Sequence, residues 1–350
     1  MIYDNVLETV GRTPVVRLRR ITAGNGSEIL VKLESFNPAG SIKDRTALGM
    51  VVRAELDGRL KPDGTIIEST SGNMGKALAL IGAARGYRVI LVTDPKAPRS
   101  MVEFVRALGA ELEIVDTPDE NGGYQRPRRE RVRRLTGEIP DSFWPDQYNN
   151  ADNAATHAEQ TARELLAEVD SFDALVAAVG TGGHISGISA TLKREKPRVV
   201  TVGVDAAGSA AFGFPVGCWA MRGLGIAWPP GNLRHELVDQ VQLVTDHEGI
   251  ATSRMLARSE GLLVGESAGA AVFGALNYAH RHPGSRIVTM CPDGGANYFG
   301  ESFDDAWLRE RGLFAPIAAN GLDRLDRLIE AAADPVHPPV HRADRVAESG

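Results

Sequence analysis

A lone lysine follows a tight turn early in the chain. The stretch ESFNPAGSIKDR covers residues 34–45, and Lys43 stands where a helix is predicted to begin. A lysine after a turn is most often a solvated surface residue. If Lys43 instead faces a cleft, partial burial lowers the pKa of its ammonium group and frees the amine for Schiff-base chemistry.

Two loops rich in glycine and small hydroxyl residues follow predicted strands. STSGNMG covers residues 69–75, and GTGGHIS covers residues 180–186. Each loop exposes backbone N–H groups at the start of a helix, where the positive end of the helix dipole favours an anion. The first loop suits a carboxylate and the second a phosphate, although an ordinary N-cap loop and a plain glycine turn explain them too. The second loop lacks both the Walker pattern and the G-x-G-x-x-G spacing.

Other polar stretches give weaker signals. GESAGAA at residues 265–271 and CPDGGANY at residues 291–298 each place small residues after an apolar run. The arginine run at residues 126–134 is either a solvated basic face or a source of cations for an anionic substrate. No metal site is expected, because the chain has only two cysteines and prolines separate His337 from His341.

Near-continuous apolar runs alternate with segments of helical spacing, which predicts an α/β fold with largely parallel sheets. The polar segment at residues 118–140 looks like a bridge between two halves, and the end of the chain looks like a mobile tail. The predicted strands are EILVKL (residues 28–33), TIIE (65–68), RVILVT (88–93), LEIV (112–115), LVAAV (175–179), VVTVGV (199–204) and IVTM (287–290).

Composition excludes several classes of protein. The chain has 350 residues, of which 43% are hydrophobic, and a net charge of −6. This is too apolar for a disordered chain and too acidic for a typical nucleic-acid binder. The N-terminus has no signal-peptide pattern and no apolar run is long enough to span a bilayer, so we expect a soluble, cytoplasmic protein without a membrane partner.

Taken together, these stretches resemble the cysteine synthase family of pyridoxal 5'-phosphate enzymes. GRTPVVRL, NPAGSIKDR, TSGN, GTGG, RGLGIAWPPGNL and GESAGAA occur in the family's order, across roughly residues 3–310. The resemblance implies a two-domain fold type II enzyme, similar to the tryptophan synthase β chain, with mostly parallel sheets and helices on both faces. It implies a larger domain at residues 1–43 and 150–320, a smaller mobile domain at residues 44–149, a flexible tail at residues 321–350, and a homodimer.

The resemblance also implies roles for individual residues. Lys43 would form the Schiff base with the cofactor and move the substrate's α-proton. Asn73 would hydrogen-bond the phenolic oxygen of the cofactor. The phosphate would lie against Gly180, Thr181, Gly182, Gly183 and His184, and the substrate carboxylate against Thr70, Ser71, Gly72, Asn73, Met74 and Gln147. A β-leaving group would depart to give an α-aminoacrylate, to which a second substrate adds.

The sequence departs from the family pattern at three positions. Where many members place a serine opposite the pyridine nitrogen, this chain has Gly294. In branches of the family that lack that serine, the serine of the GxSxG segment takes this role, so the resemblance implies Ser267 of GESAGAA, with Asp293 as the rival. The other departures are His184 and Met74, where the family commonly has threonine.

The stretch between residues 120 and 153 looks like the branch that makes 2,3-diaminopropionate precursors of siderophores and peptide antibiotics. This branch takes O-phospho-L-serine and L-glutamate and forms N-(2-amino-2-carboxyethyl)-L-glutamate. Two anionic substrates need fixed cations, and arginine suits anions that accept two hydrogen bonds. The candidate residues for binding these substrates are Arg128, Arg131 and Tyr148. The alternatives are an O-phosphoserine- or O-acetylserine-dependent cysteine or S-sulfocysteine synthase, and a catalytically silent binding homologue.

Overall fold

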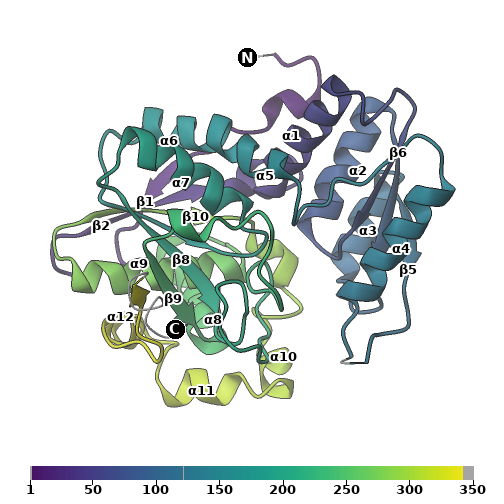
Figure 1. Ribbon diagram of the computed structural model, residues 1–350. Helices are drawn as coiled ribbons and strands as arrows, with labels where there is room; N and C mark the ends of the chain where they lie inside the picture. The colour runs from purple at the N-terminus through teal and green to yellow at the C-terminus, as the bar shows by residue number, and fades with distance from the viewer. Residues whose placement is uncertain (1, 121, 342–350) are drawn as a thin grey trace, which may run out of the picture.

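The strands form two sheets that lie side by side (Figure 1) in the computed structural model, which describes residues 2–120 and 122–341. The larger sheet has the order β1-β2-β10-β7-β8-β9-β11 and the smaller sheet has the order β5-β4-β3-β6. The larger sheet consists of β1 (Val15–Arg17), β2 (Glu28–Leu33), β7 (Ala174–Ala178), β8 (Val200–Ala206), β9 (Gln240–Val244), β10 (Arg286–Cys291) and β11 (Val340–His341). The smaller sheet consists of β3 (Thr65–Ser69), β4 (Arg88–Thr93), β5 (Glu111–Ile114) and β6 (Ser142–Phe143).

Parallel pairing dominates both sheets. Every neighbouring pair among β2, β10, β7, β8 and β9 is parallel, as are all the pairs of the smaller sheet. Only the edge strands β1 and β11 run antiparallel to their neighbours. Strand β7 is buried along its whole length, which is why it is apolar throughout instead of alternating. Strand β3 is buried as completely, although it includes Thr65, Glu68 and Ser69. The predicted α/β fold with parallel sheets is confirmed.

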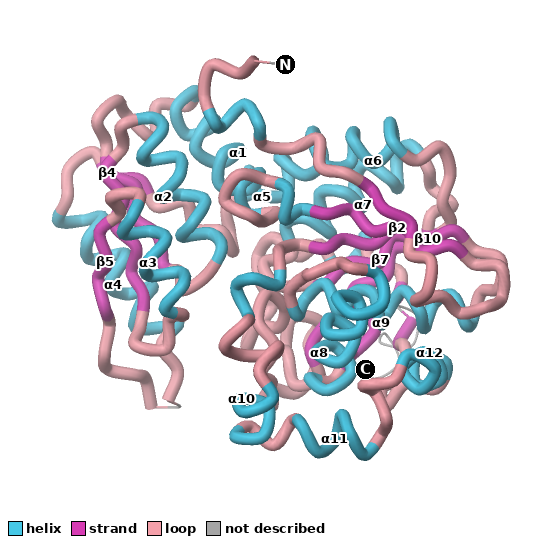
Figure 2. Tube along the Cα trace, turned by 180° about the vertical axis from the view of Figure 1, so that it is seen from behind, coloured by secondary structure: helices cyan, strands magenta, loops and turns pink. Residues whose placement is uncertain are grey.

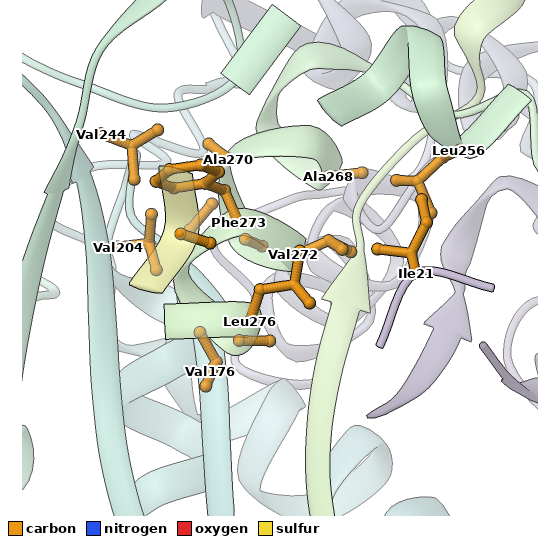
Figure 3. Packing of buried hydrophobic residues seen from close by; sticks show 14 of the residues in the cluster. Ile21, Val176, Val204, Val244, Leu256, Ala268, Ala270, Val272, Phe273 and Leu276 are labelled. Atoms are coloured by element: carbon orange, nitrogen blue, oxygen red, sulfur yellow. The ribbon is translucent and has the colours of Figure 1, made fainter. Parts of the chain in front are cut away.

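Helices cover both faces of the larger sheet (Figures 1 and 2). Figure 3 shows Phe273, Val272 and Leu276 of α9 packing among side chains of β7, β8 and β9. No helix in the described part of the chain is long and apolar enough to cross a membrane. One face is covered by α5 (Ala151–Thr156), α6 (Ala162–Glu168) and α7 (Gly183–Glu195). The helices on the side of the other face are α8 (Asp246–Met255), α9 (Glu266–Arg281), α10 (Asp305–Glu310), α11 (Phe314–Ala319) and α12 (Leu325–Ala333).

The segment predicted to bridge two halves is instead part of the smaller sheet's helical cover. Helix α4 (Gln125–Glu138) packs Val132 and Leu135 against Ile67, Ile90 and Val92 of the sheet. The sequence does not reveal this packing, because the basic run has seven charged residues and the apolar residues that pack are only Val132 and Leu135. The opposite face of the smaller sheet is covered by α1 (Lys43–Leu56), α2 (Asn73–Arg85) and α3 (Arg99–Ala107).

The end of the chain also differs from the expected flexible tail. Helix α12 packs against α9, and Leu328 and Ala332 are fully buried there. Asn277 of α9 donates a hydrogen bond to the backbone oxygen of Ala332, and β11 extends the larger sheet beside β9. Two apolar residues one helical turn apart are enough to anchor the segment, although its composition is polar. Residues 342–350 of the predicted tail lie outside the described residues.

We predict that Leu328→Ala lowers the free energy of unfolding by about 2–5 kcal/mol, because it opens a cavity beneath α12. Leu56→Ala is the matched control, since the Leu56 side chain is 81% exposed, and its effect should stay within about 0.5 kcal/mol. Urea unfolding followed by circular dichroism measures both. Equal stability of the two variants would show that the end of the chain does not pack in solution.

A buried histidine lies where α1 meets the segment between α5 and α6. The His157 ring is 2.9 Å from the hydroxyl of Thr46 through Nε2 and 2.9 Å from the hydroxyl of Thr161 through Nδ1. Burial lowers its pKa well below the usual 6.5, and the nearby His184, Arg45 and Lys43 lower it further. His157 is therefore neutral in the folded protein.

This neutral histidine predicts a loss of stability in mild acid. The unfolded chain binds a proton at this position below about pH 6.5, whereas the folded chain does not, so stability falls as the pH falls. Between about pH 7.5 and pH 5 we expect the free energy of unfolding to drop roughly 2 kcal/mol more in the wild type than in His157→Gln. Urea unfolding at both pH values measures this, and parallel losses in the two proteins would contradict a neutral His157.

Candidate active site

A cavity of about 310 Å³ lies between the two sheets, where loops that follow several parallel strands converge. Thr70 follows β3, Thr181 follows β7 and Pro292 follows β10, and all three line the cavity. The carboxyl ends of parallel strands are where α/β folds commonly bind ligands. This volume is at the lower end of the range for small-molecule sites.

Lys43 lies in the wall of this cavity as the first residue of α1. Burial lowers the pKa of its ammonium group, and the charge of Asp293 partly opposes this shift. The start of α1 is fixed by Arg45, whose fully buried guanidinium donates to Glu34 at 2.7 Å and to Glu164 at 2.6 Å. These ion pairs tie α1 to the segment after β2 and to α6, so the position of Lys43 is set by the larger sheet.

The loop between β3 and α2 presents small polar residues to the same cavity. Its backbone turns sharply, with the Gly72 amide donating to the Thr70 hydroxyl at 3.2 Å. Helix α2 has 13 residues and begins at Asn73, so its first N–H groups and its positive dipole end point at the cavity wall. An anion is favoured there. Thr70, Ser71, Gly72, Asn73 and Met74 all line the cavity, together with Gln147.

The glycine loop between β7 and α7 forms another side of the cavity. Gly182 has φ +80°, and a Cβ atom there would lie 2.7 Å from the backbone nitrogen of Leu233. A side chain at Gly183 would collide with Asn153, whose amide donates to the Thr181 hydroxyl at 3.3 Å. The two glycines thus let the start of α7, a 13-residue helix, pack closely against Leu233 and Asn153 beside the cavity.

Two polar side chains, those of Asp293 and Ser267, line the far end of the cavity. The Asp293 carboxylate accepts hydrogen bonds on Oδ2 from Asn73 Nδ2 and from the Tyr298 hydroxyl, both at 2.7 Å. Burial raises the pKa of Asp293, while the two hydrogen bonds lower it in part. Ser267 also lines the cavity, and its buried hydroxyl has no hydrogen-bond partner within the described residues.

The structure places most of the predicted site residues around one cavity, but part of the predicted phosphate loop does not line it. Gly180 and Thr181 line the cavity, whereas Gly182, Gly183 and His184 lie behind it. The His184 Nε2 atom is buried without a described hydrogen-bond partner, and burial, followed by the charge of Lys43, lowers the pKa of this ring to about 3.

The two predicted arginines are separated. Arg128 is 6% exposed, lines the cavity and pairs with Asp94 at 2.9 Å. Tyr148 lines the cavity as well, with its ring 5.5 Å from that of Trp228. Arg131 does not reach the cavity. It pairs with Glu113 of the edge strand β5 at 2.9 Å, on the outer side of the smaller sheet.

The sequence reasoning missed several residues of the cavity wall. Lys76 directly precedes ALALIGAA, the apolar run of α2 at residues 77–84, and this lone charge was a usable signal. Arg222 belongs to RGLGIAWPPGNL and Tyr298 to CPDGGANY, but only the structure shows that both residues line the same cavity. The missed lining residues that carry polar groups are Lys76, Ser100, Gln125, Trp219, Arg222, Asn297 and Tyr298.

Comparisons of this chain with a family model and with known proteins indicate the same family. The family model described as "Pyridoxal-phosphate dependent enzyme" matches residues 6–293. The N-(2-amino-2-carboxyethyl)-L-glutamate synthase of Cupriavidus metallidurans is 38% identical over 313 residues, which cover 88% of this chain and 92% of that protein. The cystathionine beta-synthase of Oryctolagus cuniculus is 41% identical over 324 residues, but these cover 89% of this chain and only 58% of that longer protein.

Solved structures agree with this result. The structure of O-ureido-L-serine synthase superposes with a TM-score of 0.80 at 34% identity, covering 88% of this chain and all of that one. The O-acetylserine dependent cystathionine beta-synthase from Helicobacter pylori gives a TM-score of 0.80 at 34% identity, with 86% and 98% covered.

The cavity itself fits the cofactor of this family. It places an amine of lowered pKa, a glycine loop at a helix start and an unpaired buried hydroxyl around one space. These groups suit the aldehyde, the phosphate and the ring nitrogen of pyridoxal phosphate, respectively. The chain belongs to the family of pyridoxal-phosphate dependent enzymes and is a fold type II β-replacement enzyme of the cysteine synthase group.

Proposed function

We propose that this enzyme replaces the phosphate of O-phospho-L-serine with the amine of L-glutamate. A C–N bond forms at Cβ of the serine skeleton, the C–O bond to phosphate breaks, and the product is N-(2-amino-2-carboxyethyl)-L-glutamate. Such a product serves the supply of 2,3-diaminopropionate for siderophores or peptide antibiotics. Relatives named for this synthase support the proposal, and the one in Ralstonia nicotianae is 37% identical over 97% of this chain and 98% of its own length.

The charge of the cavity wall is the observation that carries the proposal. Four cationic side chains line the described cavity, and Asp293 is the single carboxylate among them. A phosphorylated donor and a dicarboxylic nucleophile bring several negative charges into this small space, and fixed cations offset that charge. The four cations are Lys43, Lys76, Arg128 and Arg222.

Each part of the cavity has a defined task in this scheme. Bound pyridoxal phosphate supplies an electron sink for negative charge at Cα. Lys43 holds the cofactor and then moves the α-proton, for which a lowered pKa is an advantage. The loop at residues 70–74 binds the α-carboxylate at the start of α2, with Asn73 also facing the cofactor. The loop at residues 180–184 holds the phosphate of the cofactor, and Ser267 meets its ring nitrogen.

We place the anionic side group of a substrate near Arg128 and Tyr148. Arg128 is buried, and its Nη1 atom lies 2.9 Å from Asp94 Oδ2, which orients the guanidinium, whereas its Nε atom has no hydrogen-bond partner among the described residues. A guanidinium held in this way can donate two parallel hydrogen bonds to a carboxylate or phosphate. We retain closure of the smaller sheet's domain, at residues 44–149, and a homodimer as parts of the proposal.

The sulfur chemistry of other relatives provides the second candidate. Proteins named cystathionine beta-synthase and a structure titled cysteine synthase cover most of this chain at similar identity. These enzymes share the fold and the cofactor, so the same cavity could serve an O-phosphoserine- or O-acetylserine-dependent cysteine or S-sulfocysteine synthase. The nucleophile separates the two candidates.

The direct test offers O-phospho-L-serine with L-glutamate, sulfide or thiosulfate to the purified enzyme, and the products are identified by mass. We expect a new C–N product with glutamate and stoichiometric release of inorganic phosphate. If only the sulfur nucleophiles give a product, the enzyme is a cysteine or sulfocysteine synthase. If nothing turns over in a protein that also takes up no cofactor, it is a binding homologue.

The role of Arg128 predicts a clear difference between two neighbouring arginines. Arg128→Met should lower kcat/KM by about ten- to a hundredfold, the effect of losing a hydrogen bond between charged groups. Arg131→Met, which removes the same side chain outside the cavity, should leave kcat/KM within about twofold. Because Arg128→Met leaves Asp94 unpaired, thermal unfolding must show that the variant is folded at the assay temperature. Equal kinetics of the two folded variants would remove Arg128 from the site.

A further inference from the structure

Lys76 is a buried cation in the cavity wall to which none of the roles above assigns a particular group of the substrate or cofactor. It lies three residues beyond Asn73 in the first turns of α2 and is only 7% exposed. Helical side chains tilt toward the start of their helix, so Lys76 reaches back toward the end of α2 that faces the cavity. Burial lowers the pKa of its ammonium group, and Arg222 contributes to this shift while Asp293 opposes it.

The polar contact of Lys76 crosses from the smaller sheet to the larger one. Its Nζ atom donates to Asn297 Oδ1 at 2.5 Å, and no other hydrogen-bond acceptor is found for it among the described residues. An ammonium group has three N–H donors, so two remain for a ligand. A buried cation whose hydrogen-bond partner is neutral is costly, because the Phe104 ring, 5.0 Å from Nζ, and the charge of Asp293 offset only part of the lost hydration.

Arg222 approaches the same asparagine from the other side. Its Nη2 atom donates to the backbone oxygen of Asn297 at 3.3 Å, and its guanidinium lies 4.7 Å from the centre of the Tyr298 ring. Nη2 also pairs with Glu301 at 2.5 Å, whereas Nε is buried without a described hydrogen-bond partner. Two cations therefore border the same cavity, with the charge of Asp293 acting on both and Glu301 paired with Arg222.

We propose that Lys76, assisted by Arg222, forms an anion subsite for the second negative group of a substrate. This inference rests on the proposed function, because it needs a substrate with an anion besides its α-carboxylate. Two groups share that chemistry, namely the phosphate of the donor and the side-chain carboxylate of the nucleophile. The α-carboxylate lies at the start of α2, and Lys76 follows one helical turn later, so one bound molecule can reach both. Lys76 is thus a specificity-determining residue.

The experiment compares charged with neutral substrates in the cofactor-loaded enzyme. The nucleophile arm measures the ratio of kcat/KM for L-glutamate to that for L-glutamine. The donor arm measures the ratio for O-phospho-L-serine to that for O-acetyl-L-serine from the absorbance change of the bound cofactor, which needs no nucleophile. Both are measured for the wild type, Lys76→Met and Lys76→Arg. Lys61→Met is the matched control, since the Lys61 side chain is 63% exposed and pairs with Asp141 at 2.5 Å, away from the cavity.

We expect Lys76→Met to reduce one of the two ratios by about ten- to a hundredfold, and Lys76→Arg to restore most of it. The arm that changes identifies the anion. A merely structural contact with Asn297 would lower the rates for charged and neutral substrates alike, and unchanged ratios in both arms would overturn the proposal. If the wild type rejects glutamate, the proposed function fails, whereas the donor arm still decides whether the subsite exists.

Discussion

One buried carboxylate connects the two sheets at the active site. Asp293 follows β10 of the larger sheet, and its Oδ2 atom accepts hydrogen bonds from Asn73 of the smaller sheet and from Tyr298. Its backbone pairs with that of Ser41, two residues before Lys43. The carboxyl group thus lies where the carboxylate loop, the lysine and the end of the larger sheet meet. The relative positions of these groups depend on it.

Two polar groups at this end of the cavity remain for the cofactor ring. Two donors occupy Asp293 Oδ2, but its Oδ1 atom is buried without a hydrogen-bond partner among the described residues, and we assign the ring nitrogen to the other unpaired group, Ser267. Ser267 keeps an unpaired hydroxyl at the cavity surface. A neutral hydroxyl hydrogen-bonds a ring nitrogen without protonating it, whereas a carboxylate partner favours the pyridinium form and a stronger electron sink. A cofactor ring that withdraws electrons only moderately suits β-replacement, because the negative charge at Cα is lost when the β-group leaves.

Much of this site could be predicted from the sequence, because the signals were local. The strand before residues 180–186 is apolar throughout, and the strand before residues 69–75 has two isoleucines at its centre. Each loop combines small residues with an immediate helix start, which is a pattern that backbone geometry imposes. Their convergence on Lys43 came from the family resemblance, since a single sequence does not reveal which loops meet in space.

The missed features depend on contacts between distant segments. Arg128 and Arg131 look alike in a basic run, and only the helical phase of α4 separates a cavity residue from a surface one. Polar composition concealed that α4 and α12 are anchored by two or three apolar residues each. Lys76 and Asn297 are 221 positions apart, so their contact leaves no local signal.

The 15N chemical shift of the pyridine nitrogen, measured by NMR on the enzyme loaded with 15N-labelled cofactor, tests the central claim most directly. Our account predicts an unprotonated nitrogen that is hydrogen-bonded to a hydroxyl, with a shift that changes in Ser267→Ala and not in an exposed control away from the cavity such as Ser171→Ala. A protonated nitrogen whose shift is unaffected by Ser267→Ala would contradict the account, and would show that Asp293 meets the ring.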